Sequence, residues 1–336
     1  MKTEAITTMM MVLFLVSMLN VVVVGTTSTV ELIEWLPPLT KHEEFAFTDG
    51  STLPIKSRLL DAAGSFVFDP TVEVTVTSIG DILFSDNFDD GNFDGWTPVL
   101  GDTSWSVTST GVLHTDGTIA FPRILADSTM SFTDYIFEAD ARLLVEIPDW
   151  GGCALLFRAG DHDRFYSFQY DPGLPPSGVR LRLSRFVGWI DYYDPAANVS
   201  CPVPTEPGKW HHLKVEVVGL HIRCYIDGIK VFDVTDTPEN YPPAPVAGGI
   251  GFRTWAYSAA EFDNVTVREI IEWESFSYGD GTIDVSESLY QCNLHTRELG
   301  MPASDYMITV WLNGRSVQVG SHPFELVEPG KGKGKA

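Results

Sequence analysis

Apolar and polar residues alternate with a period of two along most of the chain after residue 28. The clearest runs, at 51–77, 151–160, 209–236 and 248–267, are rich in β-branched and aromatic residues, which favour strands. No long stretch carries apolar residues at helical spacing. The pattern predicts an all-β protein whose strands are separated by turn pairs such as Asp116-Gly117, Asp227-Gly228 and Asp280-Gly281.

The alternation breaks inside AAEFDNVTV (259–267), where Phe262 and Val265 stand three residues apart. Asp263 and Asn264 lie between them, and neither residue type is favoured in a strand. Two interpretations fit this break. The polar pair belongs to a β-bulge and hydrogen-bonds a neighbouring loop, or Asp263 is placed there to bind a ligand.

The amino-terminal segment, residues 1–28, carries an apolar run at 9–24 followed by small residues. The run is short for a bilayer span, which needs about 20 apolar residues. The segment therefore predicts a cleaved secretory signal, with an uncleaved membrane anchor as the alternative. Either way, the remaining chain is expected to be secreted or held at the cell surface.

The chain has 45 acidic and 22 basic residues and a formal net charge of -23. A surface this negative repels phosphate backbones, so nucleic acid is not an expected partner. The charge suits divalent cations or neutral sugars. Four cysteines lack the spacing of a zinc site, and their pairing stays open: Cys153, Cys201, Cys224 and Cys292.

Two flanking pieces, 29–81 and 269–328, each supply too few strands for a stable core. Together they would form one small β-sandwich, with 82–268 inserted as a second domain and 329–336 as a flexible tail. Two unrelated small domains flanking the middle one are the alternative. Pro54-Ile55-Lys56-Ser57 and Tyr306-Met307-Ile308-Thr309-Val310 resemble the opening and closing strands of the PxKF-type immunoglobulin-like repeat.

The middle domain, 82–268, resembles the concanavalin-A-like jelly roll, including its laminin-G-like, laminarinase-like and 3-keto-disaccharide-hydrolase-like branches. The motifs that carry this resemblance occur in the family's order: Phe157-Arg158-Ala159, Asp163, Tyr166, Lys209-Trp210-His211, Asp227-Gly228, Gly251-Phe252-Arg253 and Phe262-Asp263-Asn264-Val265. The resemblance implies a β-sandwich whose first and last strands lie side by side, often with a structural calcium ion between them.

This implied calcium gives Asp263 a role. The acid-rich loop at the start of the domain would repel Asp263 unless a cation lay between them, and calcium accepts carboxylate and carbonyl oxygens. The expected calcium ligands are Asp86, Asp89, Asp90 and Asp263. The loop lacks the EF-hand spacing, because Phe88 occupies a ligand position.

Catalytic motifs are weak. Glycoside hydrolysis needs two carboxylates flanking the bond. FEADARLL (137–144) offers Glu138 and Asp140 but has Leu143 where laminarinase-like enzymes carry the second Glu. The cluster Asp161-His162-Asp163 is either a polar turn or the metal-binding or acid–base group of an enzyme.

Sugar-binding jelly rolls use aromatic faces together with Arg, Asp and amide side chains. Period-two spacing places Arg253, Trp255 and Tyr257 on one strand face, and Arg158 with Ala154 and Leu156 on another. The similar levan-binding modules surround a terminal sugar with such groups. That resemblance implies a site at Arg158, Asp163, Tyr166, Trp189, Arg253 and Trp255. Burial of Tyr166 and Trp255 in the core is the alternative.

The leading hypothesis is therefore an exported, non-catalytic carbohydrate-binding or adhesion protein. Its partner, a polysaccharide or glycan, is expected on the concave face of the jelly roll, with the structural calcium ion on the other side. A glycoside or keto-sugar hydrolase using Asp161-His162-Asp163 is the second hypothesis. The third is a structural cell-surface protein that contacts other surface proteins without binding sugar.

Overall fold

The computed structural model describes most of the chain after residue 29. For residues 102, 180–187 and 190–198 it describes the backbone and not the side chains. The described ranges are 30–40, 46–48, 50, 52–144, 151–160, 164–171, 180–187, 190–204, 206–236, 245–255, 257–315 and 317–328. The predicted signal (1–28) and tail (329–336) lie outside them. None of the helices in these ranges has the length and apolar character needed to cross a membrane.

The chain divides into two compact units. One contains the described residues before Gly80 and from Ile271 onward, and the other is Gly80–Ile270. The sequence prediction placed this division at 82 and 268. The prediction of an all-β chain is confirmed: strands make up both units, and the described helical segments are short.

The first unit is built from short and long strands and one helical turn. Its elements are β1 (Leu32–Trp35), β2 (Ala46–Thr48), β3 (Thr52–Leu60), the first part of β4 (Glu73–Asp86), the last part of β18 (Ala259–Ser277), β19 (Asp284–Ser286), β20 (Leu289–His295), α2 (Thr296–Leu299), β21 (Ser304–Leu312) and β22 (Val317–Val327). One sheet has the order β1-β3-β20-β19, and β4, β21, β22 and β2 follow one another in a second sheet.

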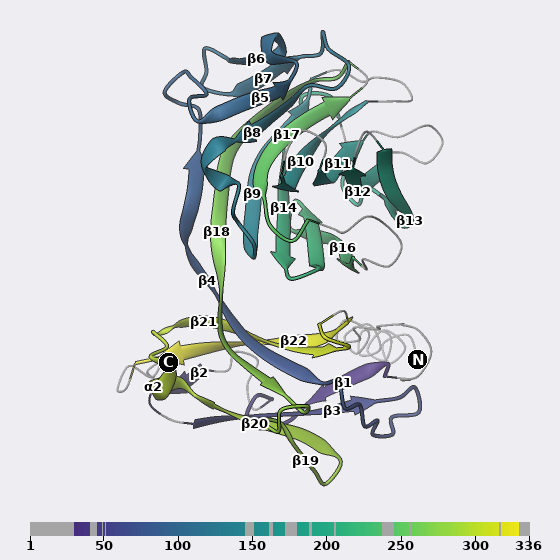
Figure 1. Cartoon of the computed structure of the whole chain (residues 1–336), viewed down its shortest axis with the longest axis vertical. Helices are drawn as coiled ribbons and strands as arrows, with labels where there is room; N and C mark the ends of the chain where they lie inside the picture. The colour runs from purple at the N-terminus through teal and green to yellow at the C-terminus, as the bar shows by residue number, and fades with distance from the viewer. Residues whose placement is uncertain are drawn as a thin grey trace, which may run out of the picture. The chain divides into compact units, whose positions relative to one another are not determined.

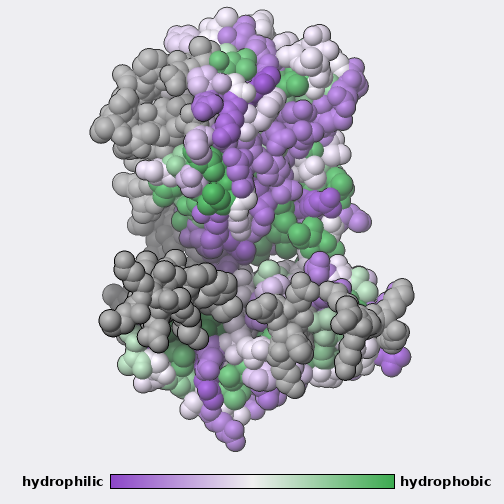
Figure 2. Space-filling view, turned by 180° about the vertical axis from the view of Figure 1, so that it is seen from behind, coloured by the Kyte–Doolittle hydropathy of each residue, from purple (hydrophilic) through white to green (hydrophobic). Residues whose placement is uncertain are grey.

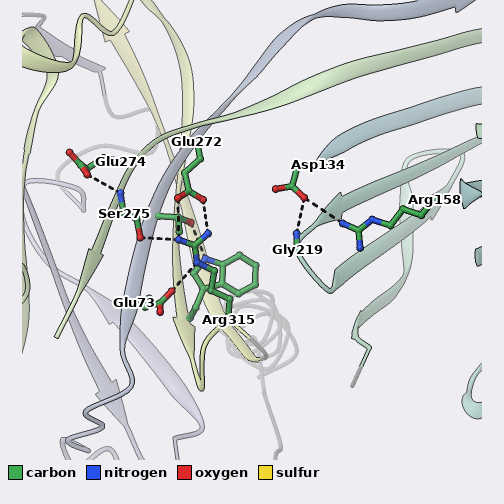
Figure 3. A network of polar contacts seen from close by, with 10 residues as sticks. Glu73, Asp134, Arg158, Gly219, Glu272, Glu274, Ser275 and Arg315 are labelled. Carbon is green, nitrogen blue, oxygen red and sulfur yellow. Dashed lines mark hydrogen bonds and ion pairs between the residues drawn. The ribbon is translucent and has the colours of Figure 1, made fainter. Parts of the chain in front are cut away.

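These two sheets share a hydrophobic core that includes Leu53, Ile55, Val74 and Val310. Polar contacts reinforce it. Arg315 forms ion pairs with Glu73 (2.8 Å) and Glu272 (2.6 Å), as Figure 3 shows.

Tyr306 donates from its hydroxyl to the carbonyl of Pro302 at 2.6 Å, a contact typical of tyrosine corners in immunoglobulin-like sandwiches. The immunoglobulin-like assignment of this unit stays a prediction, as does its interruption by an inserted domain.

The second unit, Gly80–Ile270, is a two-sheet sandwich (Figure 1). Besides its parts of β4 and β18, its elements are β5 (Trp96–Leu100), η1 (Asp102–Ser104), β6 (Trp105–Val107), β7 (Leu113–Asp116), β8 (Arg123–Ala126), η2 (Asp127–Thr129), β9 (Tyr135–Leu143), β10 (Gly152–Ala159), β11 (Phe165–Asp171), β12 (Arg180–Val187), β13 (Ile190–Ser200), β14 (His211–Val218), β15 (His221–Ile226), β16 (Ile229–Thr235) and β17 (Gly249–Trp255).

One of its sheets has seven strands in the order β13-β12-β11-β10-β17-β8-β5. In the opposing sheet β16, β15, β14, β9, β18 and β4 follow one another. The strands β4 and β18, with which this unit begins and ends, are therefore neighbours, and their long ribbons run side by side in Figure 1. This is the arrangement that the jelly-roll resemblance implied.

The core of the sandwich lies between these two sheets. Alternate residues of β14, such as Leu213 and Val215, point into it, while the residues between them are partly exposed. By contrast, every residue of β10, β11 and β17 is buried. The middle of the seven-stranded sheet is therefore covered on both faces, so its second face also holds enclosed side chains.

Candidate functional site

The second face of the seven-stranded sheet, turned away from the core, is here called the outer face. On β10, Leu155 packs in the core, whereas Leu156 belongs to a separate cluster with Leu125 and Phe165. Since strand residues alternate between faces, the described side chains on the outer face follow from this assignment. They are Arg123 and Leu125 of β8, Arg253 and Trp255 of β17, Ala154 and Leu156 of β10, and Phe165, Ser167, Gln169 and Asp171 of β11.

Strand register aligns hydrogen-bonding residues in one row across this face. Arg123 is opposite Arg253, which is opposite Ala154, and Ala154 is opposite Gln169. In the backbone register, Arg182 of β12 is opposite Gln169. Two arginines thus lie next to each other on adjacent strands, separated from Gln169 by the small side chain of Ala154.

Phe165 supports both arginines. The guanidinium carbon of Arg123 lies 5.3 Å from the Phe165 ring centroid, and that of Arg253 lies 5.7 Å from it. Both distances are typical of cation–π contacts. Arg123 and Arg253 are 2% and 5% exposed, so the two cationic groups are held in place on an enclosed face.

Trp255 lies over Gly152 in the next row. A Cβ atom on Gly152 would stand 2.3 Å from Trp255 Cζ2, so only glycine leaves room for the indole there. The guanidinium carbon of Arg253 is 5.4 Å from the indole centroid. The structure therefore brings together Arg253 and Trp255, two of the predicted site residues. The ring is only 7% exposed, as the alternative interpretation of this residue expected.

Strand β11 adds polar side chains to the outer face, and these alternate along the strand with aromatic residues of the core. Ser167, Gln169 and Asp171 are all buried, and Gln169 donates from Nε2 to Ser167 Oγ at 3.0 Å. Guanidinium groups donate hydrogen bonds, a carboxylate accepts them and an amide does both. This set matches the chemistry of sugar hydroxyls. The sequence prediction missed Arg123, Gln169 and Asp171, although the alternation in FYSFQYD would have indicated the last two.

Arg158 differs from its predicted placement. The pairing of β10 with β17 shifts register between Leu156 and Ala159, and Arg158 has a left-handed backbone (φ 48°). Its Nη2 donates to the Thr133 carbonyl at 3.1 Å and lies 3.4 Å from Asp134 (Figure 3). The expectation that Arg158 shares a face with Ala154 and Leu156 is wrong, because the bulge turns it toward the start of β9.

Tyr166 belongs to the core of the sandwich. Its ring stacks on Phe157 with centroids 5.3 Å apart, and its hydroxyl donates to Asp236 Oδ2 at 2.5 Å. It is thus on the opposite face of the sheet from Arg253. The remaining predicted residues, Asp163 and Trp189, lie outside the described residues, as does the whole Asp161-His162-Asp163 cluster.

The predicted calcium ligands occupy the other sheet and the loop after β4. Asp86 accepts from the Phe88 backbone (2.9 Å) and from Trp96 Nε1 (2.8 Å). Asp89 accepts from Asn87 Nδ2 at 2.6 Å, and Asp90 accepts from the Asn92 backbone at 3.1 Å. Within the described ranges, His, Cys, Asp and Glu side chains form no group of three or more arranged to hold a metal ion. Backbone carbonyls would have to complete such a site.

Asp263 and Asn264 occupy a β-bulge. Register between β18 and β9 shifts between Asp263 and Thr266, and Asn264 is left-handed (φ 52°). Asn264 donates to Asp140 Oδ2 at 2.8 Å. Burial raises the pKa of Asp263, and the negative charges of Asp140, Asp89 and Asp86 raise it further against one backbone hydrogen bond. The acid-rich loop and Asp263 therefore interact electrostatically, as the calcium hypothesis requires.

His212 joins two acids on the same sheet. Its Nδ1 lies 2.9 Å from Asp140 Oδ1, and its Nε2 lies 3.6 Å from Glu138 Oε1. Glu138 and Asp140 thus form an ion-paired surface network with His212, outside the outer face defined above. All four cysteines are described and none is in a disulfide.

Several solved structures are similar to just over half of this chain. A carbohydrate-binding module, CBM66, from Bacillus subtilis is 24% identical and covers 53% of this chain and 98% of its own, with a TM-score of 0.43. The laminarinase from Rhodothermus marinus is 17% identical and covers 58% and 99%, with a TM-score of 0.42. A β-glucanase from Bacillus licheniformis is 11% identical and covers 56% and 98%, with a TM-score of 0.41. No curated protein matches the chain.

The match to a protein family is more specific. The model of the 3-keto-alpha-glucoside-1,2-lyase-like domain matches residues 84–268, more than half of the chain. These residues run from β4 to β18 and contain the whole outer face. The predicted likeness to 3-keto-disaccharide-hydrolase-like jelly rolls is confirmed, and the chain belongs to the 3-keto-alpha-glucoside-1,2-lyase-like domain family.

Proposed function

We propose that this protein binds carbohydrate without cleaving it and that the glycan occupies the outer face of the seven-stranded sheet. The observation that carries the proposal is the row Arg123, Arg253 and Gln169, next to Trp255. Membership of a family named for a glucoside substrate supports a sugar as the ligand.

Each group on this face has a defined task in the proposal. Arg253 and Arg123 donate to ring or hydroxyl oxygens, and Asp171 and Gln169 accept hydroxyl protons. Phe165 holds both guanidinium groups in place, and Trp255 also contacts that of Arg253. Preorganised donors of this kind increase affinity by reducing the entropy lost when the ligand binds.

A glycan array followed by calorimetry tests this function. Arg253→Met and Gln169→Leu are each expected to weaken binding at least about tenfold, the effect of one lost charge-assisted or buried hydrogen bond. Arg158→Met is the matched control, since it removes another buried guanidinium whose contacts are Thr133 and Asp134. Equal losses in Arg253→Met and Arg158→Met would contradict the proposal. Retention of no glycan by the unmodified protein would favour a structural cell-surface role instead.

The second candidate is an enzyme acting on keto-glycosides, which the family match favours. Among the described side chains that β8, β10, β11 and β17 contribute to the outer face, one is a carboxylate, that of Asp171. A two-carboxylate mechanism would need a further acid or base, and Asp161-His162-Asp163 is the sequence candidate. Turnover of a 3-keto-glucoside that disappears in Asp163→Ala would establish this function.

Export and a structural calcium ion complete the proposal. The apolar run at 9–24 supports export, which N-terminal sequencing of the secreted protein would test. The raised pKa of Asp263 supports a cation beside β18, because the neighbouring negative charges that help to raise this pKa would also attract a calcium ion. Asp86, Asp89 and Asp263 would supply carboxylate oxygens to that ion.

A further inference from the structure

The turn that follows β17 is anchored at both ends. The Ser258 backbone N–H donates to the Trp255 carbonyl at 3.2 Å, and Ser258 Oγ donates to the same carbonyl at 2.6 Å. Ser258 Oγ also accepts from the Gly152 backbone at 2.9 Å. These contacts hold the turn against β10, next to the position where Trp255 covers Gly152.

Tyr257 is displayed at the tip of this turn. Its backbone is left-handed (φ 62°), which is uncommon for a bulky residue, and the residue is 62% exposed. Its carbonyl packs so closely on Gly117 that a Cβ there would lie 2.6 Å from the oxygen. Glycine or asparagine would adopt this backbone with less strain. A strained residue held in place by its surroundings is a reason to seek a function for its side chain.

Phe121 lies at the neighbouring end of β8. The carbonyl of Pro122 accepts a hydrogen bond from the Thr254 backbone at 3.3 Å. Phe121 precedes Pro122 and Trp255 follows Thr254, so these two residues lie on either side of that hydrogen bond. Phe121 is 47% exposed, whereas Trp255 is 7% exposed. Phe121 and Tyr257 are thus exposed aromatic residues whose backbones lie close to that of Trp255, one on the neighbouring segment and one two residues further along the chain.

We propose that Tyr257 and Phe121 form a second sugar subsite, adjoining the one at Arg253 and Trp255. Aromatic faces stack on the apolar faces of sugar rings, and stacking requires an accessible ring. Trp255 is already covered by Gly152 and Arg253, while Tyr257 and Phe121 are accessible. The ligand class is then an oligosaccharide of two or more residues, with one ring held at Arg253 and the next on the exposed aromatics. This subsite rests on the proposed function of the outer face.

Binding of a length series tests the subsite. The probes are gluco- and fructo-oligosaccharides of one to six residues, with affinity measured for each length. For the unmodified protein we expect affinity to rise at least about fivefold from one residue to two or three, within the range of one stacked ring. Tyr257→Ala and Phe121→Ala should each remove this rise while leaving binding of the single sugar unchanged.

Three controls make the outcome decisive. Phe68→Ala removes a ring that is 49% exposed in the other unit and should change nothing. Tyr257→Gly removes the ring and relieves the backbone strain, so it should raise Tm while losing the length dependence. Arg253→Met should weaken binding at every length. Length dependence that survives in both Tyr257 variants and in Phe121→Ala overturns the subsite alone. Absence of binding at every length overturns the proposed function together with it.

Discussion

At the scale of single residues, the clearest electrostatic feature is His212 between two acids. Hydrogen bonds to Asp140 and then Glu138 raise the pKa of His212 to about 9, against burial, which lowers it. The same contacts lower the pKa values of Asp140 and Glu138. The three side chains therefore form a charged network near neutral pH, and it joins β9 to β14.

This network predicts a pH dependence of stability. The folded pKa of His212 lies above its ordinary value of 6.5, so protonation favours the folded state. The stabilisation is fully present below pH 6.5 and is lost as pH rises through about 9. Because His212 is half exposed, the change should be about 1 kcal/mol or less. Urea unfolding from pH 6 to pH 10 measures it, and an equal slope in His212→Gln would contradict the assignment.

The pKa of Asp263 is shifted in the same direction as that of His212, but here it is the charged form that destabilises the fold. Its raised pKa means that the folded state holds a proton more tightly than the unfolded chain, so ionisation at neutral pH is destabilising. Without calcium, Asp263→Asn should therefore raise the free energy of unfolding at pH 7, by less than about 1 kcal/mol at this partly exposed site. With calcium, the unmodified protein should gain more stability than the variant. Identical melting with calcium and with a chelator would rule out the ion.

At the scale of elements, strand register decides the outer face. Period-two spacing in FRTWAYS correctly placed Arg253 and Trp255 on one face of β17. The same reasoning failed for Arg158, because a bulge in β10 adds a residue between Leu156 and Ala159. Alternation does not reveal where a bulge falls unless the polar pattern itself breaks, as it does at Asp263 and Asn264.

Long-range pairing explains what the sequence could not indicate. Arg123 and Arg253 are opposite each other although 130 residues separate them, so no local pattern joins them. Period-two spacing predicted that Tyr257 shares a strand face with Arg253 and Trp255. Its left-handed backbone instead ends the alternation at this residue. The fold of 84–268 was predictable because its motifs occur in family order, whereas the site depends on register.

Close packing between β17 and β8 provides a test at this scale. A Cβ on Gly251 would lie 2.2 Å from the Ile124 carbonyl oxygen, which is backbone and cannot move away cheaply. Gly251→Ala should destabilise the protein by about 1–3 kcal/mol, as overpacking does. Gly160→Ala is the matched control, since nothing lies within 4 Å of its added Cβ. Equal stabilities of the two variants in urea unfolding would show that this pairing is looser than described.

At the scale of the whole molecule, the net charge is negative, whereas the outer face carries two neighbouring arginines. The chain carries a net charge of -23, and on the face seen in Figure 2 hydrophilic residues cover large parts of the described surface beside smaller hydrophobic areas. The outer face instead concentrates Arg123 and Arg253. In the proposed function, the enclosed arginines supply donors for the hydroxyl groups of a neutral sugar, which does not need the negative charge of the rest of the chain. Binding of a neutral glycan should consequently depend little on ionic strength.

The most direct test of the central claim is hydrogen exchange measured with and without a retained glycan. Binding on the outer face should slow exchange in Phe165–Asp171 and Gly249–Trp255, which are β11 and β17. Peptides from β9 and β14, in the opposing sheet, should exchange at unchanged rates. Protection confined to β9 and β14, with none in β11 and β17, would contradict the account.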